Sequence, residues 1–169
     1  TAALAFGGFP PQTGATESWN GTSWTEVNDL TTTRYYLAGA GEQTAALAFG
    51  GSTDPGARQA VTESWNGTSW TEVNDLNLAR NTLSGAGTQT AALGFGGLTS
   101  PPFTVRGQTE SWNGTSWTEI NDLNTARYAG AASGTQSEAL GFGGDNGSGA
   151  VGNTETWNGT SWTEVNDLN

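Results

Sequence analysis

Glutamate is the residue type in this sequence best suited to catalysis, because histidine and cysteine are both absent. Their absence excludes zinc sites, copper sites and nucleophiles activated by histidine. Two glutamates recur in four units and resemble the acid and base of a glycosidase, as Glu17 and Glu26, Glu63 and Glu72, Glu110 and Glu119, and Glu155 and Glu164. A catalytic pair needs two unlike environments, whereas four equivalent copies indicate surface positions on outer strands. We therefore expect no catalytic residue, no metal site and no cofactor.

Tryptophan recurs at two positions of each unit. The first set is Trp19, Trp65, Trp112 and Trp157, and the second is Trp24, Trp70, Trp117 and Trp162. Exposed tryptophan stacks on sugar rings, as in a multivalent lectin, and buried tryptophan packs between sheets. We expect packing for the second set. For the first set ligand binding and packing stay open as equal alternatives.

Aspartate and arginine recur five residues apart between units, as Asp29 and Arg34, Asp75 and Arg80, and Asp122 and Arg127. One interpretation is a ring of charge around a channel mouth that holds an ion. The other is that each guanidinium binds a carboxylate or carbonyls of a neighbouring unit. Repeated placement favours the second interpretation, so we predict that these six residues join neighbouring units.

The segments that follow each Gly-Gly pair are the variable part of the sequence. They read FPPQTGA, STDPGARQAV, LTSPPFTVRGQ and DNGSGAVGN, at residues 9–15, 52–61, 98–108 and 145–153. Variable loops on a repeated scaffold are typical of binding surfaces, although neutral drift in a solvent loop looks the same. Phe103 and Arg106 are the strongest ligand-binding candidates, since an aromatic beside an arginine is a common interface anchor. Arg58 and Asp54 of the second loop are further candidates.

The charge of the chain limits its partners. The chain has sixteen acidic residues, five arginines and no lysine, which gives a formal net charge of -11. Such a surface repels phosphate, which argues against nucleic acid and anionic membranes as partners. No stretch approaches the ~20 apolar residues of a membrane span, so we expect no membrane insertion. A protein or glycan surface is the expected partner.

The chain is built from four repeats, which we place at residues 1–30, 31–76, 77–123 and 124–169 of one domain. The first tryptophans stand 46, 47 and 45 residues apart, the period of a propeller blade. The small residues 37–41 predict an innermost strand, and the apolar segment 44–51 predicts a second strand buried on both faces. Two outer strands flank Asn20-Gly21, a strong hairpin signal. Each repeat is therefore predicted to be one four-stranded antiparallel sheet.

These features together resemble the kelch repeat. The resemblance rests on Gly50-Gly51, Trp65, Trp70 and Arg80, and on Gly96-Gly97, Trp112, Trp117 and Arg127. It implies an all-β fold, a β-propeller of four-stranded blades, and no single activity, because kelch propellers are binding modules and more rarely enzyme scaffolds. Trp19 and its copies stand where kelch repeats usually carry tyrosine. The first repeat lacks its innermost strand, so we expect self-association or a place in a longer chain.

The functional expectation is a non-enzymatic binding or adhesion module that recognises a glycan or surface protein through the variable loops. The alternative is a structural repeat protein, a decoration or spacer without a ligand. The near-identical WNGTSW units resemble kelch-like repeat proteins of environmental bacteria and their phages. That resemblance implies an extracellular location or a place on a virion.

Overall fold

The computed structural model describes residues 2–54 and 56–169, which form strands, turns and connecting segments. Within these residues no helix is long and apolar enough to cross a membrane. The strands are β1 (Ala3–Gly8), β2 (Thr13–Trp19), β3 (Trp24–Val27), β4 (Ala38–Glu42), β5 (Ala45–Phe49), β6 (Ser52–Thr53), β7 (Ala57–Arg58), β8 (Thr62–Trp65), β9 (Trp70–Val73), β10 (Ser84–Gly87), β11 (Ala92–Phe95), β12 (Leu98–Thr99), β13 (Thr104–Val105), β14 (Thr109–Trp112), β15 (Trp117–Ile120), β16 (Ala131–Gly134), β17 (Ala139–Phe142), β18 (Thr154–Trp157) and β19 (Trp162–Val165).

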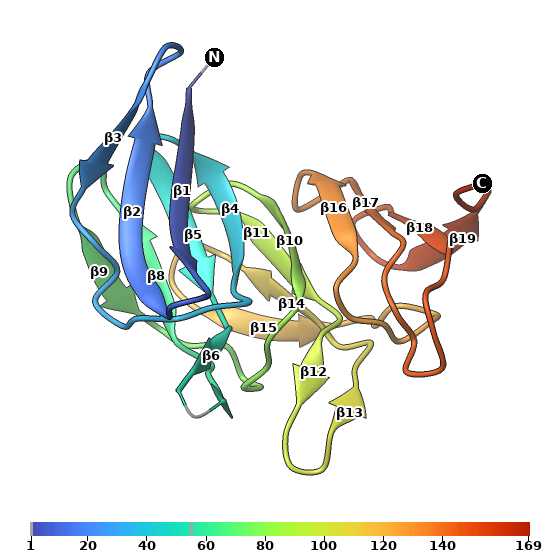
Figure 1. Cartoon of the computed structure of the whole chain (residues 1–169). Coiled ribbons are helices and arrows are strands. Elements are labelled where there is room, and N and C mark those ends of the chain that lie inside the picture. Colours follow the sequence, from blue (N-terminus) through green and yellow to red (C-terminus); the bar gives the residue numbers. More distant parts are fainter. Residues whose placement is uncertain (1, 55) are drawn as a thin grey trace.

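Four main antiparallel sheets follow one another along the chain (Figure 1). Sheet 1 has the order β1-β2-β3, sheet 2 β4-β5-β8-β9, sheet 3 β10-β11-β14-β15 and sheet 4 β16-β17-β18-β19. The all-β architecture, the strand order and the three-stranded first sheet are as predicted. The predicted innermost strand corresponds to β4, and Trp24 lies at the start of an outermost strand.

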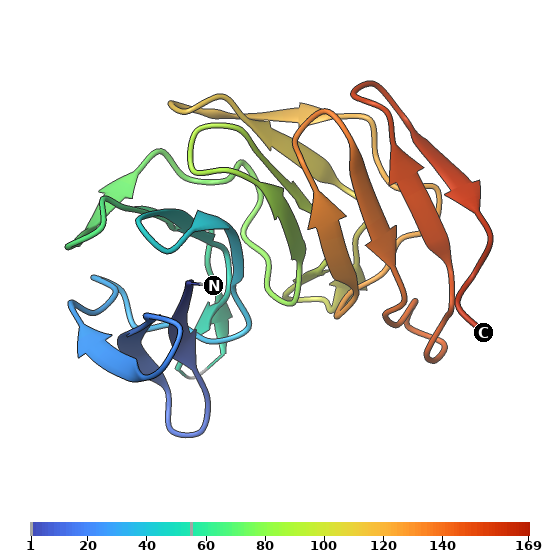
Figure 2. The ribbon, with the colours of Figure 1, turned by 90° about the horizontal axis from the view of Figure 1, so that it is seen from above.

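The four sheets form an arc with sheet 1 and sheet 4 at its two ends (Figure 2). The first strands of sheets 2, 3 and 4 are neighbours, since β10 contacts both β4 and β16. Backbone hydrogen bonds also link the connections, from Thr82 N–H to the Tyr36 carbonyl and from Ala129 N–H to the Thr82 carbonyl. All three residues have a positive φ, of 55°, 50° and 53° for Tyr36, Thr82 and Ala129. The repeated conformation shows that each connection enters its sheet in the same way.

The hairpin between the last two strands is longer than a two-residue Asn-Gly turn. Trp65 pairs with Trp70, so four residues, Asn66 to Ser69, form the loop. The Asn66 Oδ1 atom accepts hydrogen bonds from the N–H groups of Thr68 and Ser69. The asparagine side chain therefore stabilises the turn, and only its glycine has a positive φ, of 92° at Gly67.

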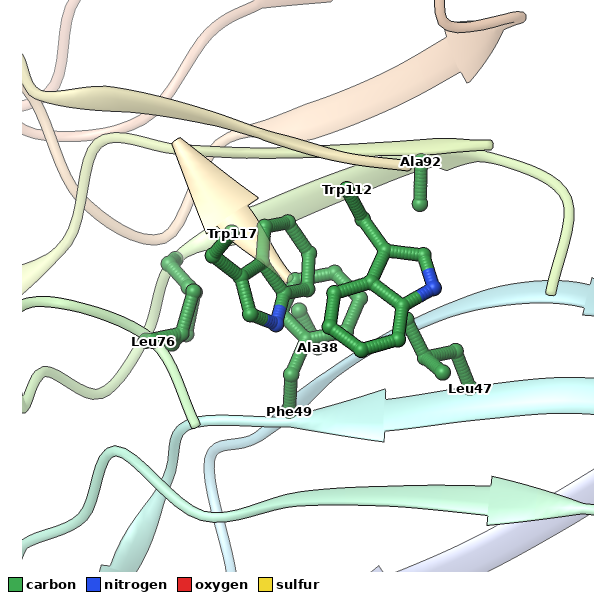
Figure 3. Close-up of a cluster of buried hydrophobic side chains, with 8 residues drawn as sticks. Ala38, Leu47, Phe49, Leu76, Ala92, Trp112 and Trp117 are labelled. Atoms are coloured by element: carbon green, nitrogen blue, oxygen red, sulfur yellow. The ribbon is translucent and has the colours of Figure 1, made fainter. Parts of the chain in front are cut away.

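The hydrophobic core consists of three clusters, one at each junction between sheets. Figure 3 shows the cluster between sheets 2 and 3, where Leu47 and Phe49 face Trp112 and Trp117. The Phe49 and Trp117 ring centroids lie 4.9 Å apart. The Phe49 ring packs closely on sheet 3 because residue 94 is glycine. A Cβ atom at this position would lie only 2.9 Å from Phe49 Cε2. Large residues of one sheet thus pack against small residues of the next, and β5 is buried on both faces as predicted.

The glycines under each phenylalanine lead to a test of this packing. Gly85 and Gly94 are cross-strand partners beneath Phe49. The equivalent pairs keep one glycine each, as Gly39 with Ala48 and Ala132 with Gly141. A Cβ atom at Gly85 would also lie 2.6 Å from the Gly39 carbonyl oxygen, so we expect Gly85→Ala to cost about 1–3 kcal/mol and Gly94→Ala about 1 kcal/mol. The double variant should cost more than their sum, because both Cβ atoms meet the Phe49 ring. Urea denaturation measures both. Strict additivity would show that the phenylalanine has room to move.

Candidate binding surface

The regular spacing of the repeats places one arginine, Arg34, Arg80 or Arg127, inside each junction between sheets. Arg80 lies between sheets 2 and 3, and its Nη2 atom is 2.9 Å from Glu110 Oε1. Its Nη1–H groups donate to the Gly96 and Gln108 carbonyls at 2.8 and 2.6 Å. Arg34 binds Glu63, Gly50 and Val61 in the same way, and Arg127 binds Glu155 and Gly141. The backbone carbonyl of each arginine accepts an N–H group of the preceding Gly-Gly pair, from Gly8, Gly51 or Gly97, so each arginine joins the preceding sheet to its own.

Burial and pairing act on these arginines in opposite directions. The Arg34 and Arg80 side chains have no exposed surface. Desolvation lowers the pKa of both guanidinium groups, and the adjacent Glu63 and Glu110 carboxylates oppose the shift. The carboxylates thereby compensate the cost of burying a positive charge.

The prediction that Glu17, Glu63, Glu110 and Glu155 all lie at the surface is wrong. Glu63, Glu110 and Glu155 are buried, and only Glu17, which no arginine precedes in the sequence, is exposed. The Glu110 carboxylate also accepts hydrogen bonds from the N–H and Nδ2–H groups of Asn77. Each buried glutamate is therefore bound by the segment that connects the preceding sheet to its own.

The aspartates Asp29, Asp75 and Asp122 are not the partners of the arginines. The Asp75 Oδ1 atom accepts the Thr62 N–H at 3.1 Å within the same sheet. Asp29 and Asp122 bind Thr16 and Thr109 in the same way. The interval of five residues did not identify a pair, because each aspartate binds the backbone of the third strand position in its own sheet, at Thr16, Thr62 or Thr109.

Three of the four tryptophans of the first set are buried and therefore inaccessible to a ligand. Trp65, Trp112 and Trp157 are only 1–3% exposed. Their indole N–H groups donate to the carbonyls of Gln43, Gln89 and Gln136. Stacking on a sugar needs an open ring face, so these three candidates are structural. Trp19 is half-buried because no sheet precedes sheet 1 in the arc.

The variable loops lie on one face of the arc, opposite the Asn-Gly-Thr-Ser turns (Figure 1). Contacts join them in series. Asp54 N–H donates to Gln12 Oε1 at 2.8 Å, which joins the first and second loops. Val105 lies against Gly147, where a Cβ atom would be only 3.1 Å from Val105 Cγ2, and so joins the third and fourth loops. We call this continuous surface the loop face.

Arg58 and Phe103 join the second and third loops at the centre of the loop face. The Arg58 guanidinium carbon lies 5.0 Å from the centroid of the Phe103 ring, which is 74% exposed. Arg58 Nη1–H donates to the Gly56 carbonyl at 2.8 Å. Arg58 Nε is buried and has no hydrogen-bond partner among the described residues. The pair presents an exposed aromatic ring with a positive charge over one of its faces.

Two hairpins that hold these candidates, β6–β7 and β12–β13, were not predicted from the sequence. Arg106 follows the second hairpin, and its Nε–H donates to Thr99 Oγ1 at 3.0 Å. Arg106 therefore braces its own loop, whereas Arg58 reaches the neighbouring loop. Asp54 is exposed, and the adjacent Pro55 lies outside the described residues.

Sequence reasoning also missed three aromatic residues of the loop face. The Phe9 and Tyr35 ring centroids lie 5.2 Å apart, and those of Tyr35 and Tyr36 lie 5.0 Å apart. Phe9 and Tyr36 are more than half exposed. The available signal was variation, because the next two connections carry Asn81-Thr82 and Tyr128-Ala129 where this one has Tyr35-Tyr36. Among the described residues, no group of three acidic side chains has the geometry of a metal site.

No protein-family model and no curated protein sequence matches the chain. A solved structure titled "Structure of YjhT" matches it with a TM-score of 0.75 at 13% sequence identity. The match covers 90% of this chain and 52% of the YjhT chain, so this chain spans about half the length of that one. YjhT is a β-propeller, and at this identity the likeness shows the fold alone. The antiparallel four-stranded sheets and this likeness together identify a β-propeller type of architecture.

Proposed function

We propose that this chain is a non-enzymatic, kelch-like binding module that recognises a glycan or a surface protein through its loop face. The observation that carries the proposal is the continuity of that face. Four variable loops contact one another in series, with Phe103 exposed beside Arg58 and Phe9 exposed on the first loop. Tyr36 is exposed on the adjoining connection between sheets 1 and 2. We further propose that the module works outside the cell or on a virion.

The chemistry of the loop face suits a partner that offers both an apolar face and polar groups. An exposed aromatic ring stacks on the apolar face of a sugar or on an aliphatic side chain. The Arg58 guanidinium beside it donates to hydroxyl, carbonyl or carboxylate oxygens. Asp54 supplies a carboxylate that accepts hydrogen bonds from hydroxyl groups. Both a glycan and a protein surface present such groups.

The buried tryptophans support a second candidate, a structural repeat protein without a ligand. Trp65, Trp112 and Trp157, together with the buried arginines and glutamates, are all occupied by the packing of the repeats. A spacer needs only this scaffold. The two candidates differ in whether the exposed residues of the loops have a partner.

Replacing Phe103 with alanine tests the binding proposal, and Arg58→Ala is a parallel variant, whereas Arg106 is left in place because it braces its own loop through Thr99. We expect at least a 30-fold loss of affinity, since aromatic and arginine anchors contribute about 2 kcal/mol or more each. A glycan array and capture of surface proteins identify the ligand, and titration measures the loss. The melting temperature should stay almost unchanged, because Phe103 is exposed.

Thr115→Ala, in a turn on the opposite face, is the matched control and should leave binding unchanged. A large loss of stability with binding intact would show that the loop is structural and that another face binds. Absence of saturable binding to any glycan or protein would favour the spacer.

A further inference from the structure

The exposed large hydrophobic residues of the described chain fall into two groups. Phe9, Tyr36 and Phe103 belong to the loop face, and the other four lie on the two end sheets of the arc. Those four are Trp24 of sheet 1 and Leu140, Val165 and Leu168 of sheet 4. The two ends therefore expose apolar surface that the proposed binding function does not use.

The end formed by sheet 1 is one half of a junction between sheets. Trp24 is 48% exposed, whereas Trp70, Trp117 and Trp162 at the same repeat position are 5–6% exposed. Each of these buried tryptophans packs on a phenylalanine of the preceding sheet, at centroid distances of 4.7–4.9 Å. Each also donates its indole N–H to a threonine hydroxyl of that sheet. Trp24 has neither kind of partner among the described residues.

The end formed by sheet 4 is the other half of the same junction. Leu140 and Leu168 are 37% and 56% exposed, whereas Leu47 and Leu93, and Leu30, Leu76 and Leu123, at the same repeat positions are buried. Phe142 stands at the position of Phe49 and Phe95, which contact tryptophan. Thr154 stands at the position of the threonines that accept an indole N–H. Asn166 matches Asn74 and Asn121, whose Nδ2–H groups donate to a carbonyl of the next sheet.

We propose that a second copy of this chain docks head to tail, with its sheet 1 on sheet 4 of the first copy. The Trp24 ring then packs on Phe142 and donates to Thr154 Oγ1. Asn166 Nδ2–H donates to the Thr22 carbonyl, as Asn121 does to Thr160 at 2.8 Å. A second copy is the fitting occupant because each end carries the groups that complete the other. Such a heterologous interface gives a ring if the rotation closes and an open chain otherwise.

The proposed junction is weaker than the inner ones. No arginine follows Arg127 in the sequence, so Glu17 of the second copy lacks the guanidinium that its copies bind. Asn169 matches Asn77 and Asn124, which donate to the buried glutamates, and it supplies these donors to Glu17. The net charge of -11 on each copy opposes association. Salt screens that repulsion, so association increases with ionic strength.

Sedimentation velocity of the purified chain over a range of concentrations tests the proposal. We expect association that strengthens with salt and weakens at least 30-fold in Trp24→Ala or Leu168→Glu, because a truncated tryptophan anchor has effects of this size. Both side chains are exposed in the single copy, so the fold is retained, as circular dichroism will verify. Phe103→Ala, an exposed hydrophobic of the loop face, is the control and should associate like the original. The proposal is wrong if the chain stays monomeric, or if neither Trp24→Ala nor Leu168→Glu weakens its association.

Cross-linking tests the orientation, because the chain has no cysteine of its own. Thr22→Cys and Asn166→Cys proteins, mixed and treated with a short bis-maleimide, should give a covalent dimer. Thr68→Cys mixed with Asn166→Cys should not, since Asn28 already occupies the Thr68 carbonyl within the chain. Efficient linking of two Thr22→Cys copies, or of the Thr68→Cys control, contradicts the head-to-tail arrangement.

Discussion

Replacing Arg80 with methionine is expected to lower the free energy of unfolding by about 3–5 kcal/mol, the cost of removing one partner of a buried ion pair. Methionine fills much of the space but leaves the Glu110 carboxylate, 1% exposed, without its positive charge. The Gly96 and Gln108 carbonyls lose their donor as well. Chemical denaturation monitored by tryptophan fluorescence measures the loss.

The repeats supply a matched control for this experiment. Glu110→Gln removes the charge from a buried, paired glutamate, and Glu17→Gln makes the same change at the exposed copy of that position. We expect destabilisation in the first variant and a change within about 0.5 kcal/mol in the second. The double variant Arg80→Met with Glu110→Leu should regain much of the loss, since no unpaired charge remains. Equal effects of the two glutamine variants would show that the ion pair adds no stability.

The sheet architecture was predictable because it depends on local patterns that are repeated four times. Small residues mark the strands at the axis, and Leu47 and Phe49 alternate with alanine in a strand buried on both faces. The Asn-Gly signal correctly located the hairpin between the outer strands. It did not define the loop length, because the Asn66 side chain stabilises a four-residue turn through hydrogen bonds that the hydrophobic pattern does not show.

The partners of charged residues were not predictable from spacing in the sequence. Arg80 and Glu110 are thirty residues apart, one on the segment that leads into sheet 3 and the other on its third strand, so only the folded sheet brings them together. A signal was available, because a buried arginine needs a buried acid and each Thr-Glu-Ser-Trp or Thr-Glu-Thr-Trp segment supplies one. The hairpins of the loop face had no such signal. The sequence around Arg58 and Phe103 lacks strand alternation, and backbone pairing alone forms these short strands.

Trp117→Ala is expected to cost about 3–5 kcal/mol, the range for truncating a buried tryptophan. The Trp117 side chain is 6% exposed and contacts Phe49 of the preceding sheet. Its Nε1–H donates to Thr62 Oγ1 at 3.0 Å. Trp117→Phe keeps a ring but removes this donor, so we expect a smaller loss of about 1–3 kcal/mol from the unpaired hydroxyl and the reduced volume.

Trp24→Ala is the matched control, because Trp24 occupies the same repeat position without a preceding sheet. It stacks on Trp19 within its own hairpin at 5.4 Å, as Trp117 does on Trp112. At a protein concentration below any association, we expect Trp24→Ala to cost no more than about 1 kcal/mol. The difference between the two alanine variants then measures what contact with the neighbouring sheet contributes. Similar losses for both would assign that stability to the tryptophan pair inside each hairpin, and the stacking of sheets would no longer explain why the tryptophans are repeated.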